Sequence, residues 1–181
     1  MKAIPPYMKY IISFVCFLII TISGFSQKKS PKIKTYIEDT GNIRPIIKNI
    51  VDQIVEYNSV DAKSTGVAGS ESTQYKRFLQ LIQQADSREM VQLTNHPSAT
   101  IRAYAFWALG KREYKSIIPD IVTPHLNDRG SFTYLSGCEP ETEQINTFYL
   151  HTLMHSPDFN YLRLSKKEKE KYNKLLIDMR K

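Results

Sequence analysis

Hydrophobic residues recur at helical spacing through most of the chain after residue 44. Apolar side chains at i, i+3, i+4 and i+7 share one face of an α-helix, and runs such as PIIKNIVDQIVEY repeat that spacing. Runs that alternate as half-buried strands do are never longer than a few residues. The pattern predicts an all-α domain of about seven helices, at 45–57, 71–85, 85–96, 98–111, 114–128, 141–155 and 165–181.

Two helix starts carry a recognisable capping signal. Asp86 is followed three residues later by Glu89, and Ser165 is followed three residues later by Glu168. This spacing is typical of a capping box, in which each side chain bonds the backbone N–H of the other residue. We therefore expect helices to begin directly after Asp86 and after Ser165.

Two stretches interrupt the helical pattern. Residues 58–70 are small, polar and glycine-containing, which predicts a long loop. Residues 128–140 are rich in turn formers around a short β-like piece from Phe132 to Leu135, which predicts an irregular insert.

The stretch LTNHPSATIRAYAFWALG, residues 93–110, resembles the HEAT repeat, whose second helix opens with Val-Arg and closes with Ala-Leu-Gly. The matching positions are Leu93, Pro97, Ile101, Arg102, Ala105, Ala108, Leu109 and Gly110. The following IIPDIVTPHLND resembles the first helix of a next repeat, so the resemblance covers 86–128. It implies a short stack of antiparallel helical hairpins that bury their apolar faces against each other. It leaves the function open.

Two departures from the HEAT pattern limit the resemblance. His96 stands at the turn position where the family has Asp, and Thr133 and Tyr134 stand where a second repeat would have Val-Arg. We therefore expect the repeat regularity to end after Asp128. The resemblance also implies that Arg102 bridges neighbouring repeats, with Asp128 as its expected partner.

The first 26 residues have the order of a secretory signal peptide. Lys2 and Lys9 accompany an apolar run from Ile11 to Ile22, and small residues precede a cleavage site near Ser26. A membrane-spanning helix needs about 20 apolar residues, so cleavage is favoured over an uncleaved anchor. The predicted organisation is a signal peptide at 1–26, an extended lead-in at 27–43 and a single all-α HEAT-like domain at 44–181. The protein is expected to be exported, to the periplasm or the cell exterior.

The net charge limits the kinds of partner that the chain can bind, and the cysteine content limits its disulfides. The net charge of +7 is mild for 181 residues, so we predict no nucleic-acid partner. The basic run KKEKEKYNK near the C-terminus allows weak membrane contact, but Glu168 and Glu170 dilute its charge. Cys138 is the single cysteine left after signal removal, which excludes an intramolecular disulfide.

Trp107 is the candidate partner-binding residue. It is the only tryptophan of the chain, and it lies outside the apolar face that its own helix presents. Aromatic residues at helical spacing most often pack in a core, but one that lies off the apolar face can line a groove. Both interpretations stay open for Trp107.

His151 and His155 are a weak candidate for a metal site. Their spacing of four residues lets both imidazoles face one ion. The zinc-protease pattern requires Glu directly after the first His, and this chain has Thr152 there. A pair of surface histidines is the plainer interpretation, and we predict no cofactor and no catalytic residue.

These features predict a non-catalytic interaction module that binds a protein or peptide through a rigid helical surface and a few aromatic anchors. The alternative is an enzyme or metal-dependent factor with its site in the irregular region 128–155, because such segments often carry chemistry on a regular scaffold. The lack of a recognisable catalytic motif favours the interaction module.

Overall fold

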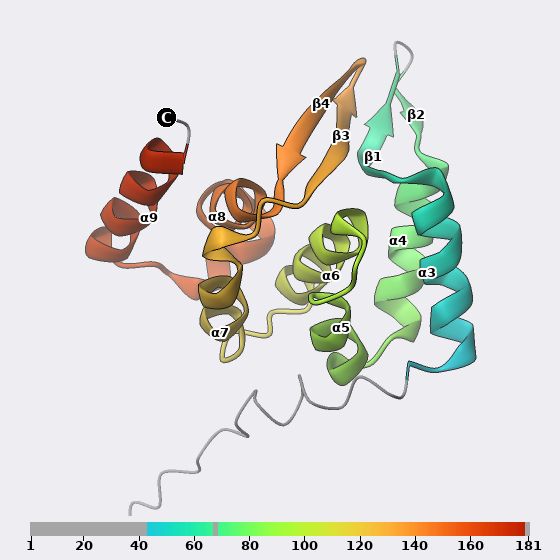
Figure 1. The fold of residues 1–181 in the computed structure, drawn as a ribbon, viewed down its shortest axis with the longest axis horizontal. Helices are drawn as coiled ribbons and strands as arrows, with labels where there is room; N and C mark the ends of the chain where they lie inside the picture. The colour runs from blue at the N-terminus through green and yellow to red at the C-terminus, as the bar shows by residue number, and fades with distance from the viewer. Residues whose placement is uncertain (1–42, 67–68, 180–181) are drawn as a thin grey trace, which may run out of the picture. The chain divides into compact units, whose positions relative to one another are not determined.

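The structure, a computed structural model, describes residues 43–66 and 69–179 (Figure 1). The α-helices are α3 (Pro45–Tyr57), α4 (Thr73–Gln84), α5 (Ser87–Leu93), α6 (Ala99–Lys111), α7 (Ile118–Val122), α8 (Ile145–His155) and α9 (Lys166–Met179). Two 3₁₀ helices, η1 (Thr123–Asn127) and η2 (Pro157–Leu162), follow α7 and α8. The strands are β1 (Ser59–Thr65), β2 (Ser70–Glu71), β3 (Ser131–Gly137) and β4 (Glu139–Gln144).

The four strands form one mixed sheet in the order β2-β1-β3-β4. The outer pairs are antiparallel, whereas β1 runs parallel to β3. Figure 1 shows α6 beneath the sheet, with α3 and α4 beside β1 and α8 beside β4. The prediction of an all-α HEAT-like domain over 44–181 is therefore wrong, because this part of the chain is a mixed α/β fold and no solenoid.

Strand β1 occupies the segment that was predicted as a loop. Its first three residues, including Asp61, are buried although two of them are polar. The Asp61 carboxylate accepts hydrogen bonds from the hydroxyls of Ser59 and Ser72, and the Asp61 backbone N–H donates to the Tyr104 hydroxyl at 2.7 Å. These bonds offset the cost of burying a carboxylate. Because Ser72 and Tyr104 are distant from Asp61 in sequence, the local pattern of residues does not predict them as its partners.

Strands β3 and β4 form a hairpin across the region predicted as an irregular insert. They pair from Ser131 opposite Gln144 to Ser136 opposite Glu139. Gly137 opens the two-residue turn with a φ of 84°, a backbone region that favours glycine. Residues 141–144, predicted as the start of a helix, belong to β4, and α8 begins only at Ile145.

The predicted helices are present at α3, α5 and α6. Helix α3 begins at Pro45, and Asp86 and Glu89 form a complete capping box at the start of α5. Helix α6 is buried nearly all round, so its hydrophobic periodicity is weak. Its Tyr104 stacks on Phe78 of α4 and its Phe106 on Tyr149 of α8; the ring centroids are 4.6 and 4.0 Å apart. Helix α6 is thus the centre of the core.

The signal peptide at 1–26 and the lead-in predicted at 27–43 lie outside the described residues, apart from Ile43. Within 43–66 and 69–179, no helix combines the length and the apolar character that a membrane crossing requires.

Candidate functional site

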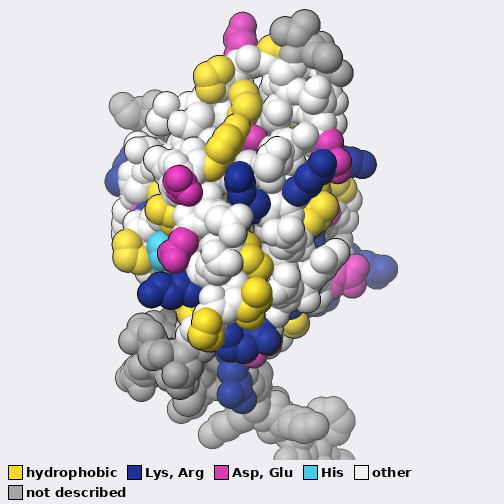
Figure 2. Space-filling model, turned by 90° about the vertical axis from the view of Figure 1, so that its right-hand side faces the viewer, with side chains coloured by type: hydrophobic (Ala, Val, Ile, Leu, Met, Phe, Trp, Pro, Cys, Tyr) yellow, Lys and Arg dark blue, Asp and Glu magenta, His cyan; other side chains and the backbone are white. Residues whose placement is uncertain are grey.

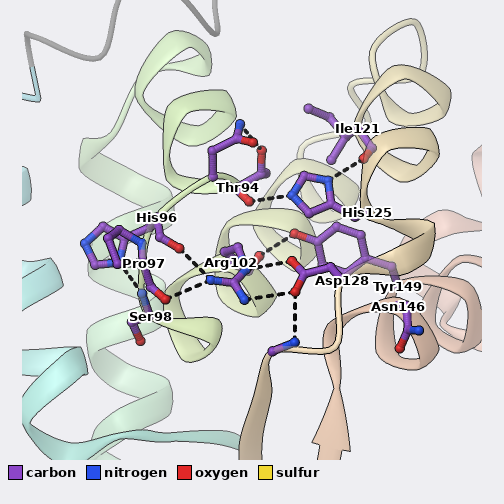
Figure 3. A network of polar contacts seen from close by, with 12 residues as sticks. Thr94, His96, Pro97, Ser98, Arg102, Ile121, His125, Asp128, Asn146 and Tyr149 are labelled. Carbon is purple, nitrogen blue, oxygen red and sulfur yellow. Dashed lines mark hydrogen bonds and ion pairs between the residues drawn. The ribbon is translucent and has the colours of Figure 1, made fainter.

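Arg102 of α6 lies at the centre of a cluster of polar contacts (Figure 3). Its Nε is 2.9 Å from Asp128 Oδ2 and its Nη2 donates to Oδ1 at 3.1 Å. The pair therefore combines one charge-assisted hydrogen bond, from Nη2, with a close charge contact at Nε. The guanidinium also donates from Nη1 to the carbonyl oxygens of His96 and Pro97, at 2.7 and 2.8 Å. The side chains of Arg102 and Asp128 are only 12% and 19% exposed, so the pair is largely shielded from water.

The cluster around Asp128 joins three parts of the fold. Asp128 Oδ1 accepts from the Gly130 N–H at 2.9 Å, and the Asp128 carbonyl accepts from the Asn146 N–H at 3.1 Å. The Tyr149 hydroxyl of α8 donates to the Arg102 carbonyl at 3.0 Å. The repeat-bridging role implied for Arg102 has no counterpart here, because Asp128 leads into a β-hairpin rather than a second repeat. The cluster instead fixes the hairpin and α8 relative to α6.

A cleft of about 450 Å³ opens where the hairpin, α8 and α6 meet. Its walls come from three elements of chain that the Arg102 cluster holds together. The lining residues are Trp107 of α6, Tyr134 of β3, Glu141 and Glu143 of β4, Thr147, Phe148, His151, Thr152 and His155 of α8, and Ser156. The volume is in the range of small-molecule sites, about 300–1,000 Å³. This cleft is the candidate functional site.

Trp107 forms one wall of the cleft and is half-buried. Its indole stacks on Phe78, with ring centroids 4.9 Å apart, and its Nε1 donates to Asp158 Oδ2 at 2.7 Å. Asp158 in turn pairs with Lys111 at 3.2 Å. Trp107 therefore belongs partly to the core and partly to the cleft, and its ring orientation is fixed by contacts on two sides.

His151 and His155 lie side by side along the cleft, with ring centroids 4.9 Å apart. Both side chains are exposed. Among residues 43–66 and 69–179, no set of three or more His, Cys, Asp or Glu side chains could hold a metal ion. Cys138 is exposed and lies in the turn of the hairpin. The two histidines thus bring donor atoms to the cleft without completing a metal-ligand set.

Two carboxylates, Glu141 and Glu143, give the cleft its charge. They are two residues apart on β4, so their side chains lie on the same face of the sheet. Tyr134 lies opposite Glu141 in the hairpin register. Burial raises the pKa of the Tyr134 hydroxyl above its usual value, and both glutamates raise it further. The carboxylates therefore act electrostatically on the aromatic wall of the cleft.

Exposed apolar residues on α3 are a weaker candidate for a functional site. Ile46 and Tyr57 are about half exposed, at 49% and 53%, and Val55 lies between them on the helix. Figure 2 shows the face that includes α3, where hydrophobic side chains are interspersed with charged ones. The Arg77 guanidinium lies 5.7 Å from the Tyr57 ring. Single exposed apolar residues are ordinary on a protein surface, so the cleft remains the stronger candidate.

Sequence reasoning proposed Trp107 and the His151–His155 pair as two separate candidates, and the structure brings all three residues to one cleft. It missed Tyr134 and Glu141. The signal that could have found them is the alternation on either side of Gly137-Cys138: aromatic residues at 132 and 134, then glutamates at 139, 141 and 143. Alternation around a two-residue, glycine-containing turn is typical of a hairpin.

Comparison of the chain with protein-family models, with curated proteins and with solved structures gives no match in any of the three. The resemblance of residues 86–128 to the HEAT repeat is therefore not supported by a family match, and the fold contradicts it. The function must be argued from the cleft itself.

Proposed function

We propose that the protein is an exported, non-catalytic interaction module that binds a protein or peptide partner in the cleft. The observation that carries this proposal is that Trp107, Tyr134 and Phe148, from three different elements, line one cleft. Aromatic side chains in a desolvated pocket supply most of the energy of many protein interfaces. Export is proposed from the charge and hydrophobic order of residues 1–26.

Selection of a random peptide library against the full chain tests this proposal. Peptides that bind the wild type should lose binding to a His151→Ala/His155→Ala variant, because both imidazoles line the cleft and are exposed. The matched control is Asn49→Ala/Gln53→Ala, an exposed pair with the same spacing on α3, whose side chains bond each other at 3.3 Å. Binding that survives in the cleft variant, or is lost in the control, would contradict the proposal.

The second candidate is an enzyme or metal-dependent factor that uses the same cleft. What favours it is that two imidazoles and two carboxylates line one cavity. A third ligand from β4 would have to move towards the histidines to complete a site. Zinc that stays bound through dialysis in the wild type, but not in the His151→Ala/His155→Ala variant, would support this candidate over the interaction module.

A further inference from the structure

The charge of the cleft is opposite to that of the chain. The full chain carries a net charge of +7, with 25 lysines and arginines. The cleft is lined by Glu141 and Glu143, and none of its lining residues is a lysine or arginine. A concave site with one sign of charge and low-dielectric walls concentrates ligands of the opposite sign.

The two carboxylates of the cleft take part in none of the ion pairs within the described residues. Among the described residues, the ion pairs involve other acids: Glu71, Glu89, Asp128, Asp158 and Glu170. Glu143 accepts one hydrogen bond, from the Thr147 hydroxyl at 3.3 Å. Since the folded core does not neutralise these carboxylates, they are available to a ligand.

Aromatic residues are the cross-strand neighbours of the two carboxylates: Phe132 pairs with Glu143 and Tyr134 with Glu141. The Phe148 ring packs at the base of the hairpin, with centroids 5.2 Å from Phe132 and 6.0 Å from Tyr134. The chain already places one cation against Trp107: the Lys111 ammonium lies 5.7 Å from the ring centroid. That ammonium is paired with Asp158 at 3.2 Å, so it does not neutralise the glutamates. Carboxylates together with aromatic faces attract a positively charged group through both charge and the π quadrupole.

We propose that the cleft recognises the positively charged side chain of a lysine or arginine in its peptide partner. The end group would lie between Glu141 and Glu143, with its apolar stem along Phe148 and Trp107. This proposal rests on the proposed function, because it names the chemistry of the partner that the module binds. A cavity of about 450 Å³ admits one such side chain together with part of its backbone.

A neutral sugar is the main competing ligand, because sugars also stack on tryptophan and tyrosine. A sugar needs paired hydrogen-bond donors and acceptors and gains nothing from net charge. The two carboxylates of the cleft can only accept hydrogen bonds when ionised. This excess of negative charge favours the cationic ligand.

Binding of four capped pentapeptides, identical except for a central Arg, Lys, citrulline or Glu, tests the proposal by calorimetry. We expect the Arg and Lys peptides to bind at least about tenfold more tightly than the citrulline peptide, and the Glu peptide not to bind. Raising the salt from about 50 to about 500 mM should weaken the binding of the Arg and Lys peptides but not that of the citrulline peptide, because ions screen exposed charges.

Two variants test whether the charge of the cleft, rather than its shape, determines binding of the Arg peptide. Glu141→Gln/Glu143→Gln keeps the side-chain size, and we expect it to weaken Arg-peptide binding at least about tenfold. Glu139→Gln is the matched control: Glu139 is on the same strand and the same face but does not line the cleft, so binding should stay within about twofold. Circular dichroism and melting temperature verify that each variant is folded.

The outcomes distinguish this inference from the proposed function. Equal binding of the Arg and citrulline peptides, or full binding by the double Gln variant, would overturn the inference. If library peptides still bind the wild type but not the His151→Ala/His155→Ala variant, the proposed function would remain supported. Binding of chitooligosaccharides in the cleft, with no peptide bound, would overturn both.

Discussion

The Arg102 cluster and the cleft lie close together in the fold, but only the cluster pairs its carboxylate with a positively charged side chain. In the cluster, the Asp128 carboxylate is matched by the Arg102 guanidinium and by the Gly130 backbone N–H. In the cleft, two carboxylates face aromatic rings and imidazoles, and none of the ion pairs in the described part of the chain includes them.

This difference separates structural charges from charges that are free to bind. A shielded carboxylate must have partners, because an unpaired buried charge costs several kcal/mol. Glu141 is exposed and Glu143 half-buried, so water can solvate them in the free protein. Stability should therefore depend on the cluster, and binding on the cleft.

Arg102→Met gives the largest expected loss of stability. The change keeps much of the side-chain length but leaves Asp128 and the carbonyls of His96 and Pro97 without their donor. We expect the free energy of unfolding to fall by about 3 kcal/mol. Urea unfolding followed by circular dichroism measures this loss, and a change below about 0.5 kcal/mol would show that the cluster is not structural.

Gly130→Ala tests the same cluster by steric means. A Cβ at this position would overlap the Arg102 guanidinium and would lie 3.0 Å from Asp128 Oδ1. Because overpacking typically costs about 1–3 kcal/mol, we expect a loss of about 2 kcal/mol in urea unfolding. Ser131→Ala, at the exposed next residue, is the control and should change stability little. Equal stability of the two variants would mean that the guanidinium can move aside without cost.

Glu89 is a third charged site, and its carboxylate, like that of Asp128, is paired within the fold. Its carboxylate accepts from Arg44 Nε and Nη2 at 2.9 and 2.7 Å, and from the Asp86 N–H at 2.9 Å. The hydrogen bonds from Arg44 lower the pKa of Glu89 from 4.5 to about 2, against the opposing effect of burial. The stabilisation is therefore complete above pH 4.5 and is lost as the pH falls through about 2.

Glu89→Gln should therefore cost stability at neutral pH and progressively less in acid. We expect a loss of about 1.5 kcal/mol at pH 7, towards the low end for charged hydrogen bonds because Arg44 is half exposed. Urea unfolding at pH 7, 5 and 3 follows the difference between variant and wild type. A difference that stays constant or grows in acid would contradict the assigned cause.

The start of α5 and strand β1 show how far sequence reasoning reaches. The start of α5 is predicted well, because Asp86 and Glu89 satisfy each other within one turn of helix. Strand β1 is not predicted, because the buried Asp61 depends on Ser72 and Tyr104, which are distant in sequence. Local signals identify elements that satisfy their own polar groups, whereas elements that need distant partners look like loops.

The hairpin of β3 and β4 was not predicted for a different reason. Its alternation and its glycine turn are present in the sequence, but the exposed glutamates of β4 lack the apolar periodicity that usually marks a strand. The acids at the start of the predicted helix 141–155 also favoured helix over strand for residues 141–144. Trp107 and the His151–His155 pair could be proposed from the sequence, but only the path of β3 and β4 shows that they share a cleft with Glu141.

Glu143→Gln should have the smallest effect on stability. Its carboxylate accepts a hydrogen bond from the nearby Thr147 hydroxyl at 3.3 Å, and removing one of two neighbouring negative charges relieves repulsion. We expect the free energy of unfolding to stay within about 0.5 kcal/mol of wild type. A loss comparable to that of Arg102→Met would mean that the cleft carboxylates are structural, and the contrast between the two regions would fail.

The most direct test is an NMR titration that follows the indole N–H of Trp107, the only tryptophan in the chain, while acetyl-arginine amide is added. We expect a saturable shift of this signal in the wild type and in Glu139→Gln, and little or no shift in the equally stable Glu141→Gln/Glu143→Gln variant. An unmoved signal in the wild type, or the same shift in the double variant, would contradict the claim that free carboxylates make this cleft a binding site for cations.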